Sequence, residues 1–203
     1  MENIAVMLIL ASQSETRKAL LTQAGLVFSC QPASIDERAL EDAAIEAGGD
    51  GRDVALLLAQ RKAAAVAVNN PGAIVIGADQ TLSLGVELLH KPADRAGAAR
   101  QLDHLRGKTH RLHAAVAVVK DDLLLWSDIQ TAELTMRDFS PEERDDVLAR
   151  EGDAILSSVG SYRLEGPSIR LFETVTGDYF TILGLPLLPL LAALRAHAPE
   201  MLS

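Results

Sequence analysis

The sequence predicts an α/β fold in which helices flank a mixed central sheet. Apolar runs that read as strands alternate along the chain with helical patterns, and turn residues such as Gly, Asn and Pro separate them. Two long apolar runs, 110–119 and 123–136, are joined by Lys120-Asp121-Asp122 and predict an antiparallel hairpin. The hairpin interrupts the alternation of strands and helices, so we expect a sheet that is mixed rather than parallel.

In the first half of the chain, turn residues bound each expected element. Gly25 ends the first helix, and the turn at 48–51 precedes a long helix rich in Ala and Leu that 69–72 closes. Gly85 turns one strand back on the next. These boundaries place strands at 4–11, 27–30, 73–84 and 86–89, and helices at 14–24, 40–47 and 53–68.

In the second half, capping residues mark the helices. Asp94 reads as an N-cap, and Ser140 followed by Pro141 opens another helix. The last apolar run is too short to span a bilayer and holds two prolines, so we expect a helix buried against the core. These signals place helices at 94–105, from 140 onward and at 186–197, and strands at 110–119, 123–136, 157–162 and 179–183.

Composition and charge exclude several classes of partner. The chain, 1–203, suits a single domain, and its net charge of −9 with 3% aromatic residues argues against nucleic acid or a membrane as partner. Cys30 is the one cysteine, which excludes an internal disulfide and a Cys-based zinc site. The N-terminal apolar run lacks a positively charged start, so we expect no signal peptide and a cytoplasmic protein. The sequence leaves a homodimer open.

The corner after the first strand carries two hydroxyls and two cations. Ser12, Ser14, Arg17 and Lys18 stand where a strand gives way to a helix N-terminus, whose free N–H groups favour anions. The corner therefore suits a phosphate. A plainer interpretation is that the serines cap the helix and the cations form its solvated face, and this segment alone favours that interpretation.

Three more residues combine with this corner. Asp79 lies within an apolar strand, where a carboxylate is costly unless it is paired or binds a metal. Lys91 follows the hairpin that returns from Asp79, and Lys62 lies on the neighbouring long helix. Each lysine alone is usually a surface residue, but an acid with several cations suits phosphates and Mg²⁺.

Short segments in a defined order cover nearly the whole chain: LILASQSETRKALL, SIDE, LAQRKA, GADQ, HKP, LRGKTH, GSYRLEG and GDYFTILGLPL. Together they resemble the Maf family, the septum-formation-inhibitor-like nucleoside triphosphate pyrophosphatases. The resemblance implies a fold related to inosine triphosphate pyrophosphatases, with two lobes and a cleft. It implies hydrolysis of nucleoside triphosphates to monophosphate and pyrophosphate with Mg²⁺ or Mn²⁺, and removal of modified nucleotides is one implied role.

The resemblance also implies roles for single residues. The implied phosphate-binding residues are Ser12, Arg17, Lys62 and Lys91. Asp79 matches the proton acceptor, and Glu37 matches an acidic residue near the metal. A carboxylate suits both a base and a metal ligand, so both roles stay open for Asp79.

Base specificity is implied to depend on Thr16, Gln80 and Glu165. Gln80 with Glu165 resembles the 7-methyl-GTP subgroup, and a carboxylate suits the N–H edge of guanine. That subgroup has Trp where this chain has Thr16, and a cationic methylated base would gain from an aromatic face. Two alternatives remain: a dTTP/UTP pyrophosphatase, and a nucleotide-binding regulator of septum formation without significant catalysis.

Overall fold

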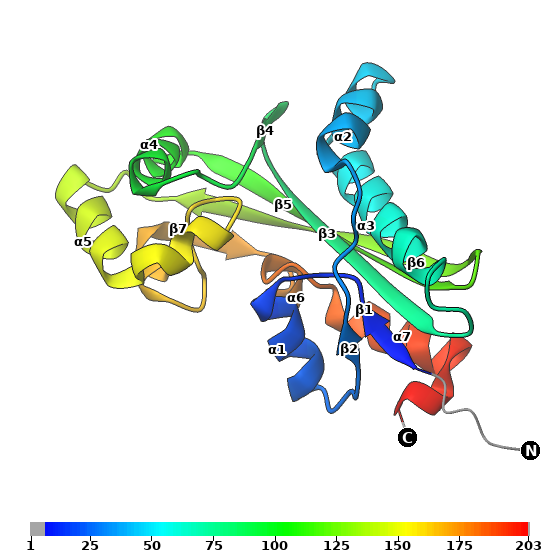
Figure 1. Cartoon of the computed structure of the whole chain (residues 1–203). Coiled ribbons are helices and arrows are strands. Elements are labelled where there is room, and N and C mark those ends of the chain that lie inside the picture. The colour runs from blue at the N-terminus through cyan, green and yellow to red at the C-terminus, as the bar shows by residue number, and fades with distance from the viewer. Residues whose placement is uncertain (1–6, 203) are drawn as a thin grey trace, which may run out of the picture.

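A mixed seven-stranded sheet forms the centre of the protein (Figure 1). The structure is a computed structural model that describes residues 7–202. The sheet order is β2-β1-β3-β5-β6-β7, with β4 paired to β3. β1 pairs in parallel with β2 and β3, and every other pairing is antiparallel. The strands are β1 (Leu8–Leu10), β2 (Ser29–Cys30), β3 (Ile74–Leu84), β4 (Glu87–Leu89), β5 (Thr109–Lys120), β6 (Leu123–Met136) and β7 (Phe172–Thr176).

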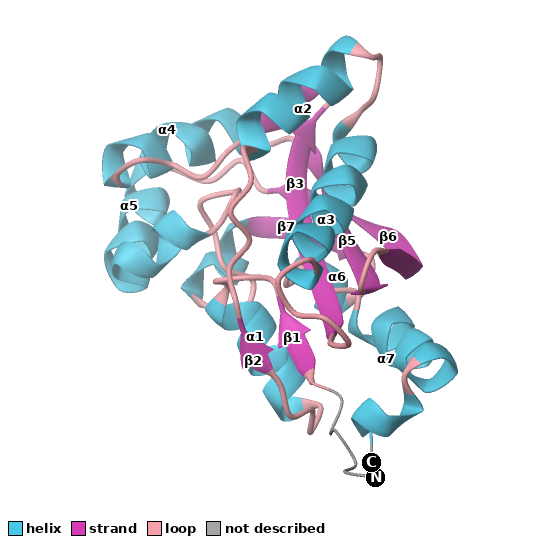
Figure 2. Ribbon diagram, turned by 45° about the vertical axis from the view of Figure 1, so that its right-hand side comes forward, coloured by secondary structure: helices cyan, strands magenta, loops and turns pink. Residues whose placement is uncertain are grey.

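Helices flank this sheet, as predicted (Figure 2). The α-helices are α1 (Glu15–Gln23), α2 (Glu37–Glu46), α3 (Gly51–Ala67), α4 (Arg95–Leu105), α5 (Pro141–Glu151), α6 (Tyr179–Ile182) and α7 (Leu187–His197). Three 3₁₀ helices follow α5, precede β7 and close the described chain: η1 (Gly152–Ser157), η2 (Pro167–Leu171) and η3 (Pro199–Leu202). Asp94 caps α4 and Ser140 caps α5, as expected. None of the helices within residues 7–202 is long and apolar enough to cross a bilayer.

Two predicted strands are wrong and one strand was missed. The stretch 157–162 runs from the end of η1 into an irregular loop, in which Ser161 has a positive φ of 56°. The stretch 179–183 is helical because Asp178 accepts from the Thr181 backbone N–H at 2.9 Å and starts α6. Short apolar runs do not distinguish strand from helix by periodicity. Phe172–Thr176 is the missed strand, an edge strand with mostly exposed residues. Positions 4–6 of the first expected strand lie outside the described residues.

The long central strands carry separate hydrophobic cores at their two ends. In β3, Ile74 and Ile76 belong to a core with β1, α1 and α7, which we call the α1 lobe. Leu82 belongs to a second core built with α4, α5 and β6, which we call the α5 lobe. α3 packs on one sheet face through a third, alanine-rich core that contains Ala59 and Ala63. The predicted two-lobed form is therefore present, and the polar residues of β3 lie between the two ends.

Candidate active site

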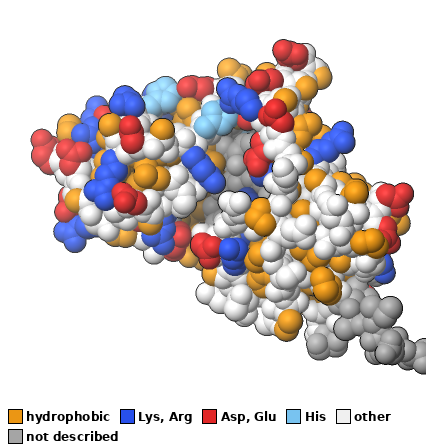
Figure 3. Space-filling model, viewed as in Figure 1, with side chains coloured by type: hydrophobic (Ala, Val, Ile, Leu, Met, Phe, Trp, Pro, Cys, Tyr) orange, Lys and Arg blue, Asp and Glu red, His pale blue; other side chains and the backbone are white. Residues whose placement is uncertain are grey.

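A cleft of about 830 Å³ lies between the two lobes (Figure 3). The β1–α1 corner and the starts of α1 and α2 line it. The middle of α3, the middle of β3, the end of β4 and the loop after η1 also line it. Every site residue predicted from the sequence lines this cleft: Ser12, Thr16, Arg17, Glu37, Lys62, Asp79, Gln80, Lys91 and Glu165. Residues from six separate segments therefore meet in one space.

Gly77 sets how closely α3 approaches β3. A Cβ at this position would lie 2.1 Å from the carbonyl oxygen of Ala59 and 2.6 Å from the backbone nitrogen of Ala63. Only glycine therefore lets the helix backbone lie this close to the strand. Because successive side chains alternate across a strand, Asp79 points to the same face as Gly77, toward Lys62 on α3.

Asp79 is the buried acid of the cleft, with only 7% of its surface exposed. Lys62 Nζ donates to Asp79 Oδ1 at 2.6 Å and lies 2.9 Å from Glu37 Oε1. Burial raises the pKa of the Asp79 carboxyl, while the charges of Lys62 and Arg17 oppose that rise. The result is a carboxylate that binds a proton more readily than a free aspartate does, and that lies beside cations.

Arg17 is fixed in the cleft by the protein backbone. Its Nε donates to the Gly184 carbonyl at 2.8 Å, and its Nη1 donates to the Ala78 carbonyl at 3.0 Å and to Ser12 Oγ at 3.3 Å. Burial lowers the pKa of Arg17, and the nearby Asp79 carboxylate opposes that shift. The guanidinium is therefore a pre-positioned cation.

The other residues of this corner divide between the two interpretations. Ser14 caps α1 by accepting from the Arg17 backbone N–H at 3.3 Å. Lys18 pairs with Glu15 at 2.6 Å and does not line the cleft. Lys18 thus has the plain structural role, Ser14 caps α1 and also lines the cleft, and Ser12 and Arg17 lie in the cleft.

Lys91 is the third cation in the cleft. Burial lowers its pKa, the like charges of Arg17 and Lys62 lower it further, and the carboxylates of Asp79 and Glu37 raise it. Lys91 and Asp79 line the same cleft, so the hairpin returns Lys91 toward Asp79, as the sequence predicts. An acid surrounded by three cations favours an anionic ligand such as a polyphosphate.

The same cleft carries the residues predicted to read the base. Gln80 Nε2 donates to the carbonyls of Thr181 and Ile182 at 3.1 and 3.0 Å, so its amide orientation is set by α6. Glu165 Oε1 accepts from Arg163 Nε at 3.3 Å. Sequence reasoning missed Arg163, although it stands inside the quoted GSYRLEG segment.

Two histidines, His110 and His113, lie on β5, and one of them affects the cleft wall. His113 Nε2 pairs with Ser83 Oγ at 2.9 Å. His110 Nε2 pairs with the Tyr162 hydroxyl at 2.7 Å, and burial lowers the pKa of His110 to about 4. Tyr162 is the one Phe, Tyr or Trp among the described cleft residues, and it is only 4% exposed. Among the described residues, the cleft therefore offers no open Phe, Tyr or Trp face for a base.

The donor set suits a divalent cation that binds together with a phosphate ligand. Within residues 7–202, no group of three or more His, Cys, Asp or Glu side chains is arranged to hold a metal. Glu37 and Asp79, however, both contact Lys62 Nζ, so two carboxylates lie on either side of one ammonium group. Mg²⁺ is typically bound by one or two carboxylates plus substrate phosphates, and this pair fits that pattern.

Several known proteins are similar to this chain. The family model described as Maf-like protein matches residues 7–197. A Brucella abortus protein named 7-methyl-GTP pyrophosphatase is 53% identical over 95% of this chain and 96% of its own length. A Bradyrhizobium diazoefficiens protein named nucleoside triphosphate pyrophosphatase is 53% identical over 94% of this chain and 93% of its own. A HAM1 protein from Coxiella burnetii aligns with a TM-score of 0.45 and 17% identity over 66% of this chain and 74% of its own.

Proposed function

Because the chain belongs to the Maf-like protein family, we propose that it is a nucleoside triphosphate pyrophosphatase. The reaction converts a nucleoside triphosphate and water to the nucleoside monophosphate and pyrophosphate. The observation that carries this proposal is the cluster in the cleft, in which buried Asp79 lies among Arg17, Lys62 and Lys91. The names of the relatives that match over almost their whole length support it.

The chemistry follows from the charges in the cleft. A water oxygen forms a bond to the α-phosphorus, the bond from that phosphorus to the bridging oxygen breaks, and pyrophosphate leaves. The water gives a proton to Asp79, whose raised pKa makes it a better base than a free aspartate. Arg17 and Lys91 bind the phosphate oxygens, on which negative charge develops as the bond breaks.

Lys62 has a separate part in this scheme. Its ammonium group contacts both Asp79 and Glu37, so it holds the two carboxylates in place until the substrate arrives. We propose that Glu37 and Asp79 hold a divalent cation, Mg²⁺ or Mn²⁺. When bound, such a cation neutralises phosphate charge.

A preference for guanine-type bases is the second part of the proposal. Glu165 has one oxygen, Oε2, that accepts no hydrogen bond from the described residues, and a carboxylate matches the two N–H groups of the guanine edge. The relatives named 7-methyl-GTP pyrophosphatase from Brucella and Mesorhizobium, at 53% and 52% identity, support the same direction. Since Thr16 offers no aromatic face, the carboxylate of Glu165 is the proposed source of selectivity for the cationic methylated base.

The test is a substrate panel with the wild type and one variant. Purified protein with Mg²⁺ is incubated with GTP, 7-methyl-GTP, UTP and dTTP, and kcat and KM are measured from the release of pyrophosphate. We expect turnover with the highest kcat/KM for the guanine nucleotides. Glu165→Gln should lower kcat/KM for these two by about tenfold relative to UTP, because a polar group that is mispaired once the bound base covers it costs roughly 1–3 kcal/mol. A wild type that prefers UTP or dTTP would contradict the guanine preference.

A further inference from the structure

The loop that carries Glu165 is fixed from behind by side chains of the α5 lobe. This loop, 158–166, connects η1 to η2 and lines the cleft. The hydroxyl of Ser161 donates to Gln101 Oε1 on α4, and the Tyr162 hydroxyl pairs with His110 on β5. The loop is therefore anchored to α4 and β5. These contacts do not involve its two charged side chains, Arg163 and Glu165, whose orientation depends on other residues.

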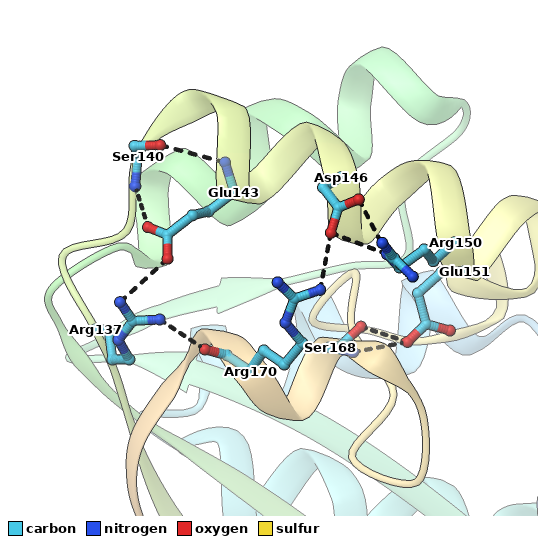
Figure 4. Close-up of polar contacts among 8 residues, drawn as sticks. All are labelled: Arg137, Ser140, Glu143, Asp146, Arg150, Glu151, Ser168 and Arg170. Atoms are coloured by element: carbon cyan, nitrogen blue, oxygen red, sulfur yellow. Dashed lines mark hydrogen bonds and ion pairs between the residues drawn. The ribbon is translucent and has the colours of Figure 1, made fainter.

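Glu151, the last residue of α5, lies directly behind this loop. Its side chain is only 1% exposed. Its Oε1 accepts from both the backbone N–H and the hydroxyl of Ser168, at 3.0 and 2.7 Å, as the dashed lines in Figure 4 mark. Its Oε2 is buried and accepts no hydrogen bond from the part of the chain that the structure describes.

The hydrogen bonds to Ser168 do not explain why a charged side chain occupies position 151. A neutral glutamine would serve Ser168 equally well, since one acceptor oxygen makes both of those hydrogen bonds. A buried carboxylate oxygen without a donor is costly unless a cation compensates it. The cation that lies near it is Arg163, whose Nη1 is 3.5 Å from Glu151 Oε2.

Arg163 lies between two carboxylates. Its Nε donates to Glu165 Oε1 at 3.3 Å, while its Nη1 faces Glu151 Oε2 at 3.5 Å. Both distances are long for a charged pair, which typically closes to about 2.7–2.9 Å. The guanidinium is thus shared between a buried, fixed acid and an acid in the cleft.

We propose that Glu151 and Arg163 are positioning residues that set the carboxylate of Glu165 for recognition of a guanine-type base, an inference that rests on the proposed function. The charge on Glu151 attracts the guanidinium of Arg163 and keeps it from closing on Glu165. Glu165 Oε2 and one acceptor position of Oε1 therefore remain available for hydrogen bonds from the base. Without the charge on Glu151, the forked guanidinium closes on Glu165 and occupies both oxygens, because bidentate pairing is the favoured arrangement.

Glu151→Gln is the direct test. The amide oxygen keeps the hydrogen bonds to Ser168, but its NH₂ group faces Arg163, donor against donor. We expect kcat/KM for GTP relative to UTP to fall by about five- to tenfold, mainly because KM for GTP rises. A change of this size corresponds to the coupling energy that is usual between neighbouring charged residues. kcat for UTP should stay within about twofold, since the phosphate-binding residues are unchanged.

A matched control lies one residue away on the same helix. Arg150 is exposed and pairs with Asp146 (Figure 4), outside the cleft. Arg150→Gln changes one charge of α5 and should leave the GTP/UTP ratio unchanged. Arg163→Gln should also lower the ratio, but for a different reason, because Glu165 loses the Nε contact at 3.3 Å that orients its carboxylate. Arg163→Lys should partly restore the ratio, because an ammonium group supplies the charge without the fork.

Each outcome decides the inference. An unchanged GTP/UTP ratio in both Glu151→Gln and Arg163→Gln, with a lowered ratio in Glu165→Gln, overturns it and leaves the proposed function intact. An equal fall of kcat/KM for all nucleotides means that the pair only supports the fold, and this also overturns it. If Glu151→Gln does not fold, the two Arg163 variants decide alone, since that side chain is 36% exposed. A wild type without turnover overturns the proposed function together with this inference.

Discussion

Gly77→Ala tests how the fold creates the active site. The added methyl group would lie 2.1 Å from the Ala59 carbonyl oxygen, whereas an ordinary contact begins at 3.4 Å. α3 would have to move by the difference, about 1.3 Å. Such overpacking typically costs about 1–3 kcal/mol of unfolding free energy. The same shift lengthens the 2.6 Å contact between Lys62 and Asp79, and a misplacement of about 1 Å costs on the order of 10²-fold in rate.

Urea unfolding and steady-state kinetics measure the two effects separately. We expect a loss of about 1–3 kcal/mol in unfolding free energy and of at least about tenfold in kcat. Gly97→Ala is the control, because Gly97 lies on α4 outside the cleft and its nearest neighbour is the side chain of Asp94 at 3.2 Å. A Gly77→Ala protein with wild-type kcat would refute the argument that this close approach positions Lys62.

Three further outcomes are expected. Asp79→Asn should lower kcat by about 10²-fold or more with the urea midpoint nearly retained, and near wild-type kcat would exclude Asp79 as the base. In a profile of kcat/KM against pH, the acid limb should lie above pH 3.8, because Asp79 must be ionised and its pKa is raised, and the alkaline limb should lie below pH 10.5, because Lys91 must be protonated and its pKa is lowered. Lys91→Ala should remove the alkaline limb, and an unchanged alkaline limb would exclude Lys91 as its source. Below pH 6.5 the unfolded chain binds a proton on His110 that the folded protein binds only near pH 4. The free energy of unfolding of the wild type should therefore decrease by about 3 kcal/mol as the pH is lowered from 7 to 4, and that of His110→Gln should decrease less. Urea titrations at pH 7 and pH 4 would measure both values.

The fold class and most elements follow from local pattern in the sequence. Asp94 and Ser140 cap helices that begin where predicted, because a capping side chain acts on backbone groups within three residues of itself. The long hairpin is also local, and the strand 123–136 has the predicted bounds. The prediction failed at 157–162 because contacts of Ser161 and Tyr162 with α4 and β5 determine the backbone there. It failed at 179–183 because the local cap by Asp178, which starts a short helix, was overlooked.

The residues that the sequence predicts for the site share one cleft, but their arrangement could not be predicted. The sequence and the family resemblance place Asp79 and Lys62 together, yet the reason for their contact is Gly77, whose role depends on a helix packed across the strand. Arg163 and Glu151 lie twelve residues apart across an irregular loop, and no periodic pattern connects them. The side-chain contacts that position Glu165 therefore required the structure.

Hydrolysis in ¹⁸O-labelled water tests the central claim most directly. The proposed attack on the α-phosphorus places the labelled oxygen in the nucleoside monophosphate and leaves the pyrophosphate unlabelled, and mass spectrometry of the two products distinguishes them. We expect GTP and the wild-type protein with Mg²⁺ to give labelled GMP and unlabelled pyrophosphate. Label in the pyrophosphate, or release of orthophosphate with GDP, would contradict the proposed reaction.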